Sequence, residues 1–491
     1  MASKCEENIT LPDGRNVKTI TSVVEANEKD VDIAVEAATK AFNEKWIHVN
    51  GQERGRLINK FADLLERDLD ELAAIEALDN GKAYTIAKSE DLPFTITVFR
   101  YFAGWCDKIH GKVIETQGDK FCYTRHEPIG VCGAIIPWNY PLLMVAWKLG
   151  PALACGNTIV LKTSELTPLT ALKVAALFKE AGFPKGVVNV LSGFGPTAGA
   201  AIASHMKIDK VAFTGSTTTG RSIMKAAADS NLKKVSLELG GKSPNIILAD
   251  SDLEEAVKWA YQGIYANHGQ CCCAGSRVYV EDSIYDNFVE KFKTYAQNIK
   301  VGDPFHKDTF QGPQISQRQF DRIMGYIEAG KKEGATLLLG GKRHGDKGFF
   351  VCPTIFTDVV KFYSKHIYSY ELLYDFLLCN IFKNENMTIM QEEIFGPVVA
   401  IAKFKTIDEV IEKAHLTKYG LAAAVFTKDI TRAIKISNAL RAGTVWVNCY
   451  NVVNTNAPFG GFKESGFGRE LGKYALELYT QVKTVQINLE C

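Results

Sequence analysis

The sequence predicts an α/β protein built on a doubly wound parallel sheet, and three of its features support this prediction. Short β-prone runs alternate with amphipathic helices from about residue 131 to residue 239, as in strands that are joined by helical crossovers. A second alternation of the same kind begins near Ser251. The chain of 491 residues is also too long for one simple core, so we expect two or three domains.

Helices are predicted first, between Asp30 and about Leu78, where apolar residues such as Val31, Val35 and Ala38 recur at helical spacing. The strands of the first alternation are predicted at residues 131–136, 158–162, 187–191, 210–214 and 234–239. Between two of them, a helix over residues 169–181 is expected to end at Gly182, because glycine is the preferred residue just past a helix.

The second half is predicted to contain further helices and strands and to end in a β-prone tail. Helices are expected at residues 253–265, 284–299 and 319–333, and strands at 277–280 and 400–404. The tail, residues 480–489, needs a sheet to join, and residues 121–129 are β-prone as well. We therefore expect strand pairing between subunits of a homo-oligomer, either a dimer or a tetramer.

Composition argues against several classes of partner. A formal net charge of +1 gives no electrostatic reason to expect nucleic acid or a membrane surface as a partner. The longest apolar run, near residues 372–382, is too short to span a bilayer. No histidine or cysteine spacing indicates a metal site, so none is expected. The twelve cysteines, three of them adjacent, and an N-terminus without an apolar signal core predict a reduced, cytoplasmic protein.

The three adjacent cysteines lie in the segment GQCCCAGSR, residues 269–277. Small residues around a thiol leave room for a substrate to reach the sulfur, and a nucleophilic cysteine usually has a lowered pKa. Buried cysteines are also common as small apolar side chains. By itself, this segment does not decide which thiol, if any, is catalytic.

Two further motifs offer groups that would suit a thiol nucleophile. Glu238, in LELGGKSP, is predicted at a strand end among apolar residues, where burial would raise its pKa toward that of a general base. Asn139, in IPWNYP, is predicted between a strand and the helix that Pro141 opens, and its amide could donate to an oxyanion. The alternatives are a surface carboxylate and a structural N-cap.

A dinucleotide site is indicated only weakly by motif. FTGSTTTG, residues 213–220, follows a predicted strand and opens a helix, so its backbone N–H groups could receive a pyrophosphate, but it does not match the usual glycine pattern. Gly193, Gly195 and Gly199 come closer and are one residue too long. Lys162 and Glu165 could bind an adenosine ribose, favouring NAD over NADP, or could form a solvated ion pair.

Together the motifs resemble those of the aldehyde dehydrogenase superfamily. IPWNYP, FTGSTTTG, LELGGKSP, GQCCCAGSR, EEIFGPV and PFGGFKESGFGRELG occur in that family's order, and the similarity runs from about residue 23 to residue 489. It is closest to the broad-specificity cytosolic and mitochondrial NAD-dependent branch, and to fungal members in particular. The resemblance implies an enzyme that oxidises small-molecule aldehydes to carboxylic acids with NAD⁺.

The resemblance also implies a role for individual residues. Cys272 is expected to be the nucleophile and Glu238 the general base, while Asn139 and the Cys272 amide form the oxyanion hole. The NAD site would comprise Lys162, Glu165, Gly215, Ser216, Gly220, Glu393 and Phe395. The substrate tunnel would be lined by Tyr140, Met144, Trp147 and Phe459, with Asn451 and Val453 in its most variable part.

The resemblance further implies three regions in the chain. Residues 1–109 and 129–240 would form a Rossmann-like NAD-binding domain, and residues 241–464 a second α/β catalytic domain. Residues 110–128 and 480–491 would form a small β element for oligomerisation.

The sequence departs from the family at two places. Members usually carry an additional block near the N-terminus, and residues 360–383 form an atypical apolar insertion of 24 residues without glycine or proline. We hypothesise a lost exon and a translated intron, with a docking helix or interface element as the alternative. The departures allow a catalytically impaired or structural protein as the second interpretation. A cofactor-independent cysteine hydrolase or acyltransferase is less favoured, because no motif contains a histidine.

Overall fold

The computed structural model describes residues 6–8, 20–357, 359 and 385–489. The predicted insertion at residues 360–383 therefore lies outside the described residues, as does most of the N-terminal segment that departs from the family pattern. At the start of the described chain, a short strand pair joins β1 (Glu6–Asn8) to β2 (Ser22–Val24) in antiparallel orientation.

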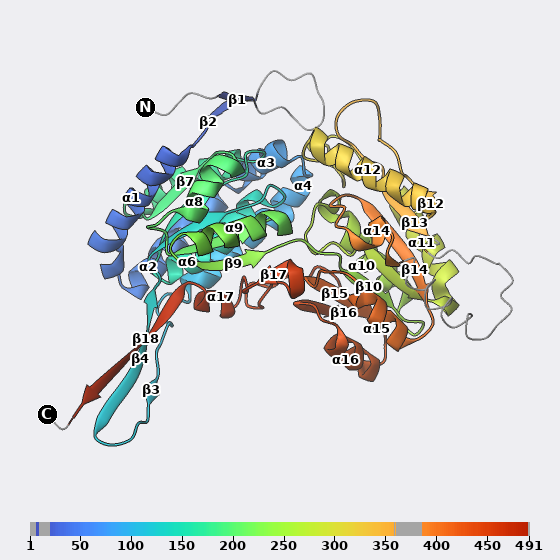
Figure 1. Ribbon diagram of the computed structural model, residues 1–491. Helices are drawn as coiled ribbons and strands as arrows, with labels where there is room; N and C mark the ends of the chain where they lie inside the picture. The colour runs from blue at the N-terminus through green and yellow to red at the C-terminus, as the bar shows by residue number, and fades with distance from the viewer. Residues whose placement is uncertain (1–5, 9–19, 358, 360–384, 490–491) are drawn as a thin grey trace.

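The first large sheet has six strands in the order β17-β9-β8-β5-β6-β7 (Figure 1). All neighbours pair in parallel except β17, which runs antiparallel to β9. The strands are β5 (Val131–Ile135), β6 (Thr158–Lys162), β7 (Val188–Leu191), β8 (Lys210–Thr214), β9 (Lys234–Glu238) and β17 (Gly466–Phe467). The predicted strands are thus confirmed to within one residue at either end, and the doubly wound sheet is confirmed.

This sheet is doubly wound because the chain moves outward from β5 in one direction, through β6 and β7, and then in the other, through β8 and β9. Side chains of β5, β6 and β8 are buried, as expected for strands covered by helices on both faces. In such sheets ligands bind at the carboxyl ends of the strands where the order reverses, which here is between β5 and β8. Helices of this half are α1 (Glu28–Glu44), α2 (Gly51–Arg67), α3 (Leu69–Asn80), α4 (Tyr84–Ile86), α5 (Leu92–Ala103), α6 (Pro141–Ala154), α7 (Leu169–Ala181), α8 (Ala200–Ser204) and α9 (Thr217–Asp229).

Helix α7 ends at Gly182, as the sequence predicts. Gly182 has a φ of 100°, a left-handed conformation that a side chain would strain, and its N–H returns to the carbonyls of the last turn. On one face of the sheet, α1 and α8 pack against β5, β6 and β7, and on the other α2, α5, α6 and α7 form one apolar layer.

The second large sheet has seven strands in the order β12-β13-β14-β11-β10-β15-β16. It is parallel except for the pair of β12 with β13, which confirms a second α/β unit. Its strands are β10 (Pro244–Ile247), β11 (Arg277–Glu281), β12 (Thr336–Leu339), β13 (Thr354–Thr357), β14 (Val398–Phe404), β15 (Ala422–Phe426) and β16 (Thr444–Val447). Its helices are α10 (Leu253–Tyr265), α11 (Tyr285–Gln297), α12 (Gln317–Glu333), α14 (Thr388–Gln391), α15 (Ile407–His415) and α16 (Ile430–Ala439), and α17 (Tyr474–Glu477) follows near the C-terminus.

A three-stranded antiparallel sheet extends away from the body of the protein as an arm (Figure 1). It consists of β3 (Val113–Ile114), β4 (Lys120–Pro128) and β18 (Thr480–Asn488), and β18 pairs with β4 along its whole length. The C-terminal tail thus finds its sheet within its own chain, which corrects the expectation that this strand needs a second subunit as partner. Helix α17 precedes β18 and leads the chain back to β4, from which β18 is far removed in sequence.

Candidate active site

A cavity of about 530 Å³ lies at the carboxyl edge of the first sheet, between the two large sheets. The loops after β5, β8 and β9 line it, together with the turn before β11 and the N-terminal part of α12. Ten of the residues that the sequence analysis singled out line this one cavity: Asn139, Tyr140, Met144, Glu165, Gly215, Ser216, Glu238, Cys272, Glu393 and Phe395.

Cys272 lies in a tight turn between a short 3₁₀ segment, Ala266–Gly269, and β11. Its side chain is partly buried, and its thiol donates to Glu238 Oε1 at 3.7 Å. Contacts with the Cys271 and Cys273 thiols, burial and the charge of Glu238 raise the pKa of the Cys272 thiol above its ordinary value. None of these main influences on the pKa of Cys272 is a cation that would lower it.

Glu238 ends β9 and points into the cavity from the sheet edge. Only 3% of the residue is exposed, and burial raises the pKa of its carboxyl to about 8. A surface carboxylate, the alternative interpretation, is therefore wrong. A carboxyl with this pKa is partly ionised near neutral pH and can still accept a proton from water, as a general base must.

Asn139 lies between β5 and α6, and its side chain reaches the loop that carries the cysteines. Tyr140, rather than Asn139, is the N-cap of α6, and Pro141 is the first residue of that helix. The alternative role of Asn139 as an N-cap is therefore wrong. Its amide donates one hydrogen to the carbonyl of Gln270 at 3.0 Å, which places the amide next to the segment that ends in Cys272.

Asn267, which the sequence analysis did not single out, connects these two loops. Its amide nitrogen donates to the carbonyl of Asn139 at 2.9 Å and to the carbonyl of Gln270 at 3.1 Å. The amide of Asn80 also donates to the Asn139 carbonyl, at 3.4 Å. Asn267 has a φ of 48°, a left-handed conformation that asparagine tolerates better than most residues. Together with the Asn139 amide, this side chain joins the asparagine loop to the cysteine loop.

Asn267→Gly is expected to slow attack by the thiol about 10- to 100-fold, since an ångström of misplacement has an effect of this size. Glycine accepts the positive φ without strain, so the loss would come from the missing amide. Asn267→Asp should behave alike, because a carboxylate cannot donate to two carbonyls. The measurement is the single-turnover rate of aldehyde oxidation. Alkylation of Cys272 by iodoacetamide, which forms no oxyanion, should stay unchanged; an unchanged single-turnover rate would contradict the role.

The turn from β8 into α9 offers backbone N–H groups to the cavity. Ser216 is the N-cap of α9, and its hydroxyl accepts from the Thr219 N–H at 3.3 Å. The turn is close to the sheet, because a Cβ on Gly215 would lie 2.5 Å from the ring of Phe213. Gly220, in contrast, does not line the cavity: it lets α9 approach Leu239, whose side chain a Cβ at this position would meet at 2.9 Å.

Lys162 is the last residue of β6, and Glu165 lies in the loop that follows. Their charged groups lie 3.5 Å apart, and Lys162 also donates to the carbonyl of Thr163 at 2.8 Å. Lys162 is buried, so the pair is not a solvated ion pair. Only Glu165 lines the cavity itself.

Glu393 and Phe395 enter the cavity from the loop before β14. Glu393 Oε1 accepts from the Gly241 N–H at 3.0 Å, and burial raises the pKa of its carboxyl to about 7. Phe395 has a φ of 60°, a strained conformation for a side chain of this size. Helix α12 holds the loop: Gln319 donates to the Phe395 carbonyl at 2.8 Å and Arg322 to the Glu393 carbonyl at 3.1 Å. The sequence predicts this helix. It does not reveal that Gln319 and Arg322 fix the position of the loop, because neither side chain belongs to a recognisable motif.

The predicted tunnel residues fall into two groups. Tyr140 and Met144 line the cavity, whereas Trp147 and Phe459 do not. The rings of Trp147 and Phe459 pack edge to face with centroids 5.4 Å apart, and both side chains are buried. In the variable part of the predicted lining, Asn451 Oδ1 accepts from the Cys273 thiol at 3.2 Å.

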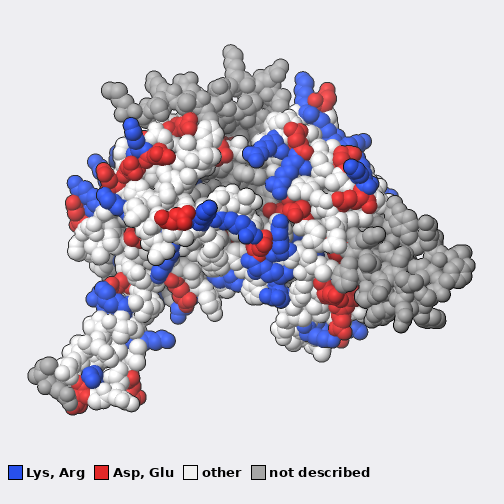
Figure 2. Space-filling view, in the orientation of Figure 1, with Lys and Arg blue, Asp and Glu red and all other residues white. Residues whose placement is uncertain are grey.

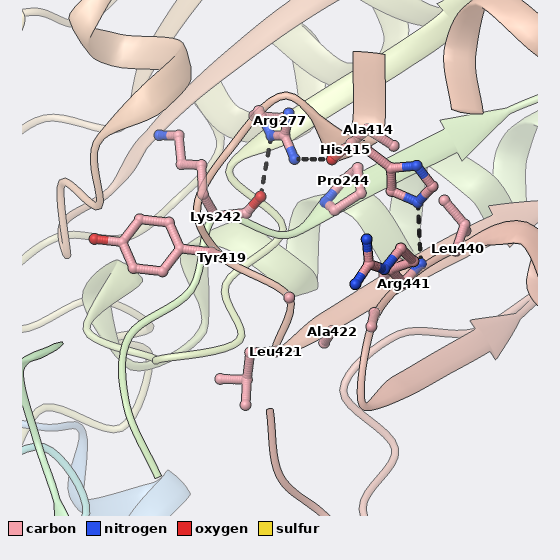
Figure 3. Close-up of a pocket in the computed structure, with 13 residues that line it drawn as sticks. Lys242, Pro244, Arg277, Ala414, His415, Tyr419, Leu421, Ala422, Leu440 and Arg441 are labelled. Carbon is pink, nitrogen blue, oxygen red and sulfur yellow. Dashed lines mark hydrogen bonds between the residues drawn. The ribbon is translucent and has the colours of Figure 1, made fainter. Parts of the chain in front are cut away.

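A second, much smaller cavity is shown in Figure 3, and its free volume is about 10 Å³. Arg277 spans it, donating to the carbonyl of Lys242 at 3.0 Å and to that of Ala414 at 2.9 Å. The N–H of Arg441 donates to His415 on the other side. The space is about that of one water molecule, so this cavity cannot hold an aldehyde or a dinucleotide. The Arg277 side chain instead anchors the segment after Glu238 through the Lys242 carbonyl.

The charged side chains on one face of the molecule can be compared directly. Basic and acidic side chains are interspersed over the surface seen in Figure 2. Within the described ranges, the protein contains no helix that is long and apolar enough to cross a membrane.

A sequence profile described as the aldehyde dehydrogenase family matches residues 2–368 and 376–485. The chain belongs to the aldehyde dehydrogenase family. An aldehyde dehydrogenase of Emericella nidulans is 62% identical over 474 residues, which cover 96% of this chain and 90% of the relative. The mitochondrial aldehyde dehydrogenase of Homo sapiens is 56% identical, with 96% and 87% covered. The family resemblance, including that to fungal members, is thereby confirmed.

Solved aldehyde dehydrogenases share the fold as well. The NAD⁺ complex of aldehyde dehydrogenase from Bacillus cereus is 51% identical, with a TM-score of 0.92, and the match covers 99% of this chain and 93% of that one. Betaine aldehyde dehydrogenase from Staphylococcus aureus, in complex with NAD⁺, has a TM-score of 0.92 at 40% identity, covering 100% and 93%. The α/β fold class is confirmed by these neighbours.

Proposed function

We propose that this aldehyde dehydrogenase oxidises aldehydes to carboxylic acids with NAD⁺, using Cys272 as nucleophile. The observation that carries the proposal is that one cavity brings together a thiol, a buried carboxyl with a pKa of about 8, a side-chain amide and a helix N-terminus. The second interpretation, an impaired or structural protein, gains no support, because the described residues assemble the complete set of groups.

The residues present fit NAD⁺. The N-terminus of α9, a helix of 13 residues, directs N–H groups and a positive dipole end toward the cavity, which suits a pyrophosphate. Glu165 lies where a carboxylate can accept from a ribose hydroxyl, with Lys162 beside it, and Glu393 offers a second carboxyl for the other ribose. When bound, NAD⁺ supplies the hydride acceptor. The complexes of the Bacillus and Staphylococcus relatives with NAD⁺ support this cofactor.

The side chains divide the chemistry among them. The Cys272 sulfur attacks the aldehyde carbon, and Glu238, which is hydrogen-bonded to the thiol, is placed to receive its proton. The Asn139 amide and the Cys272 N–H stabilise the oxyanion that forms. After oxidation, Glu238 takes a proton from the water that hydrolyses the thioester on Cys272. Tyr140 and Met144 offer apolar surface to the substrate, in keeping with aliphatic or aromatic aldehydes.

The experiment that tests the function is a substrate panel with the purified chain. NADH formation is measured with acetaldehyde, longer aliphatic aldehydes and benzaldehyde, and the acid product is identified. We expect NADH and acid in equal amounts. A chain that binds NAD⁺ but forms no NADH with any aldehyde would contradict the proposal.

The preference for NAD⁺ over NADP⁺ should depend on Glu165. Glu165→Gln removes the charge that would repel a 2′-phosphate, and we expect kcat/KM for NADP⁺ to rise about tenfold relative to that for NAD⁺. Glu180→Gln, which removes a surface carboxylate paired with Arg67, is the matched control and should leave the ratio unchanged. An unchanged ratio in the Glu165 variant would contradict the assignment.

We also propose a cytoplasmic homo-oligomer, a dimer or tetramer assembled through the β3-β4-β18 arm. The arm carries exposed apolar side chains, among them Val113, Val482 and Leu489, at residues 110–128 and 480–491. We further assign the region around the first sheet, residues 1–109 and 129–240, as the cofactor domain. The region around the second sheet, residues 241–464, is assigned as the catalytic domain. Light scattering of the full chain, with and without residues 480–491, tests the role of the arm.

A further inference from the structure

We propose that Cys271, Cys272 and Cys273 form a binding site for one soft divalent metal ion, such as Zn²⁺ or Cd²⁺, which blocks the active-site thiol. Within the described part of the chain, these three are the one group of cysteine, histidine and acidic side chains whose geometry could hold a metal ion. The inhibitory consequence rests on the proposed function, whereas the binding itself does not.

The three sulfur atoms converge although they belong to consecutive residues. All lie within 4.8 Å of one another, and the Sγ atoms of Cys271 and Cys273 are 3.5 Å apart. Neighbouring side chains usually diverge, but here the backbone turns sharply, with positive φ angles at Asn267, His268 and Gly269 just before the cysteines. In a tetrahedral site with Zn–S bonds of about 2.3 Å, the sulfurs lie about 3.8 Å apart. Small rotations of the side chains therefore suffice to bring three sulfurs onto one ion.

The donor set selects the kind of ion. Thiolates favour Zn²⁺, Cd²⁺ and similar soft ions over Mg²⁺ or Ca²⁺, which prefer oxygen ligands. A water from the cavity would provide the fourth ligand, because Glu238 Oε1 lies 3.7 Å from the Cys272 sulfur but does not belong to the group of side chains that converge on one another. Binding breaks three S–H bonds, forms three metal–sulfur bonds and releases three protons, so that no oxidant or reductant is needed.

The ion would have a route to the site. Cys272 lines the large cavity, whereas Cys271 and Cys273 are buried directly behind it. An ion that enters as the aldehyde does would meet the Cys272 sulfur first and then acquire the other two ligands. Since the same sulfur must attack the aldehyde, a bound ion and the reaction exclude each other, and a chelator should restore activity.

The test compares the wild-type chain with Cys271→Ser, Cys273→Ser and the double serine variant. Each is titrated with Cd²⁺ under reducing conditions, and two quantities are followed: the ultraviolet absorption of cadmium–thiolate bonds and the rate of NADH formation. In the wild type we expect one ion that is bound by three sulfurs and removed by EDTA. In the double variant, activity without metal should persist, while the Cd²⁺ concentration for half inhibition should rise at least about 100-fold, since even indirect ligand contacts are worth 10- to 100-fold.

Three controls make the outcome decisive. Iodoacetamide, which reacts with a single thiol, should inactivate both the wild type and the double variant. Cys272→Ser, which removes the central sulfur, should lose the corresponding cadmium–thiolate absorption. Mg²⁺ should not inhibit at the same concentrations.

Equal Cd²⁺ sensitivity of the wild type and the double variant would overturn the proposal, because Cys272 alone would then account for inhibition. Unchanged cadmium–thiolate absorption in Cys272→Ser would also overturn it, placing the ion elsewhere. If the chain oxidises no aldehyde, the proposed function fails, and the absorption titration still decides whether the three-cysteine site exists. Thermal unfolding of each variant shows whether it is folded; should a serine variant be unfolded, the alanine variant at the same position is used.

Discussion

Replacing Cys272 with alanine is expected to lower the rate of aldehyde-dependent NADH formation at least about ten-thousand-fold, the scale on which enzymes lose activity with their nucleophile. The residue's sulfur is the one thiol of the cysteine run that lines the large cavity, and it is hydrogen-bonded to the candidate base Glu238. Alanine removes the sulfur that is proposed to bond to the aldehyde carbon, while the hydrogen bond from Asn139 to Gln270 is kept. The measurement is the NADH progress curve under saturating aldehyde and NAD⁺.

The neighbouring cysteines serve as controls for this prediction. Cys271→Ser and Cys273→Ser alter buried thiols behind the cavity and should retain aldehyde oxidation. NAD⁺ binding to Cys272→Ala, measured by quenching of protein fluorescence, should match the wild type, since no proposed cofactor contact is changed. A rate near that of wild type in Cys272→Ala, or a complete loss of activity in folded Cys271→Ser, would show that another thiol is the nucleophile.

The protonation of the Cys272 thiol bears on how this nucleophile is activated. Its pKa is raised by contacts with the other two thiols, by burial and by Glu238, so the free thiol is protonated near neutral pH. The ion pair with a nearby cation that activates many cysteine enzymes is not part of this arrangement within the described residues. The proposed transfer of the thiol proton to Glu238, which accepts its hydrogen bond, would tie the first chemical step to the same carboxylate that serves the last.

The first sheet could be predicted from the sequence because its signals are local and agree with one another. Strands such as Thr158–Lys162 and Lys210–Thr214 are centred on three consecutive apolar residues, and the helix Leu169–Ala181 ends at a glycine. A parallel strand pair requires a crossover, so the order of elements limits the topology. The carboxyl edge of that sheet then places Asn139 and Glu238 in one region, as the motifs indicate.

What the sequence could not predict are contacts between distant segments. Asn267 bridges two loops through hydrogen bonds to carbonyls at positions 139 and 270, and no local pattern distinguishes this asparagine from any other turn residue. Trp147 and Phe459, both predicted to line the tunnel, pack edge to face against each other, and this contact depends on the orientation of side chains more than on position in a motif. The pairing of the C-terminal tail with β4 is a contact between residues more than 350 positions apart.

Glu238→Gln should slow the hydrolysis of the thioester about 10²- to 10⁴-fold, the usual contribution of a general base, and should slow the oxidation step much less. Glutamine keeps the size of the side chain and can still accept the hydrogen bond of the thiol, but it cannot take a proton from water. In a rapid-mixing experiment the variant should therefore form about one NADH per active site in a fast phase and then turn over slowly. A linear progress curve at the wild-type rate would contradict the assignment.

The pH dependence of the same step gives an independent check on Glu238. Because burial raises the pKa of its carboxyl to about 8, the fraction of Glu238 that is ionised and able to act as a base falls as the pH drops below that value. In the wild type the rate of thioester hydrolysis should therefore rise about tenfold per pH unit below pH 8 and level off above it, as the fraction of carboxylate does. In Glu238→Gln this rise should disappear, leaving at most the dependence on hydroxide. A wild-type profile that is flat from pH 6 to 9, measured as the slow phase after the NADH burst, would mean that the base has an ordinary pKa or that another group activates the water.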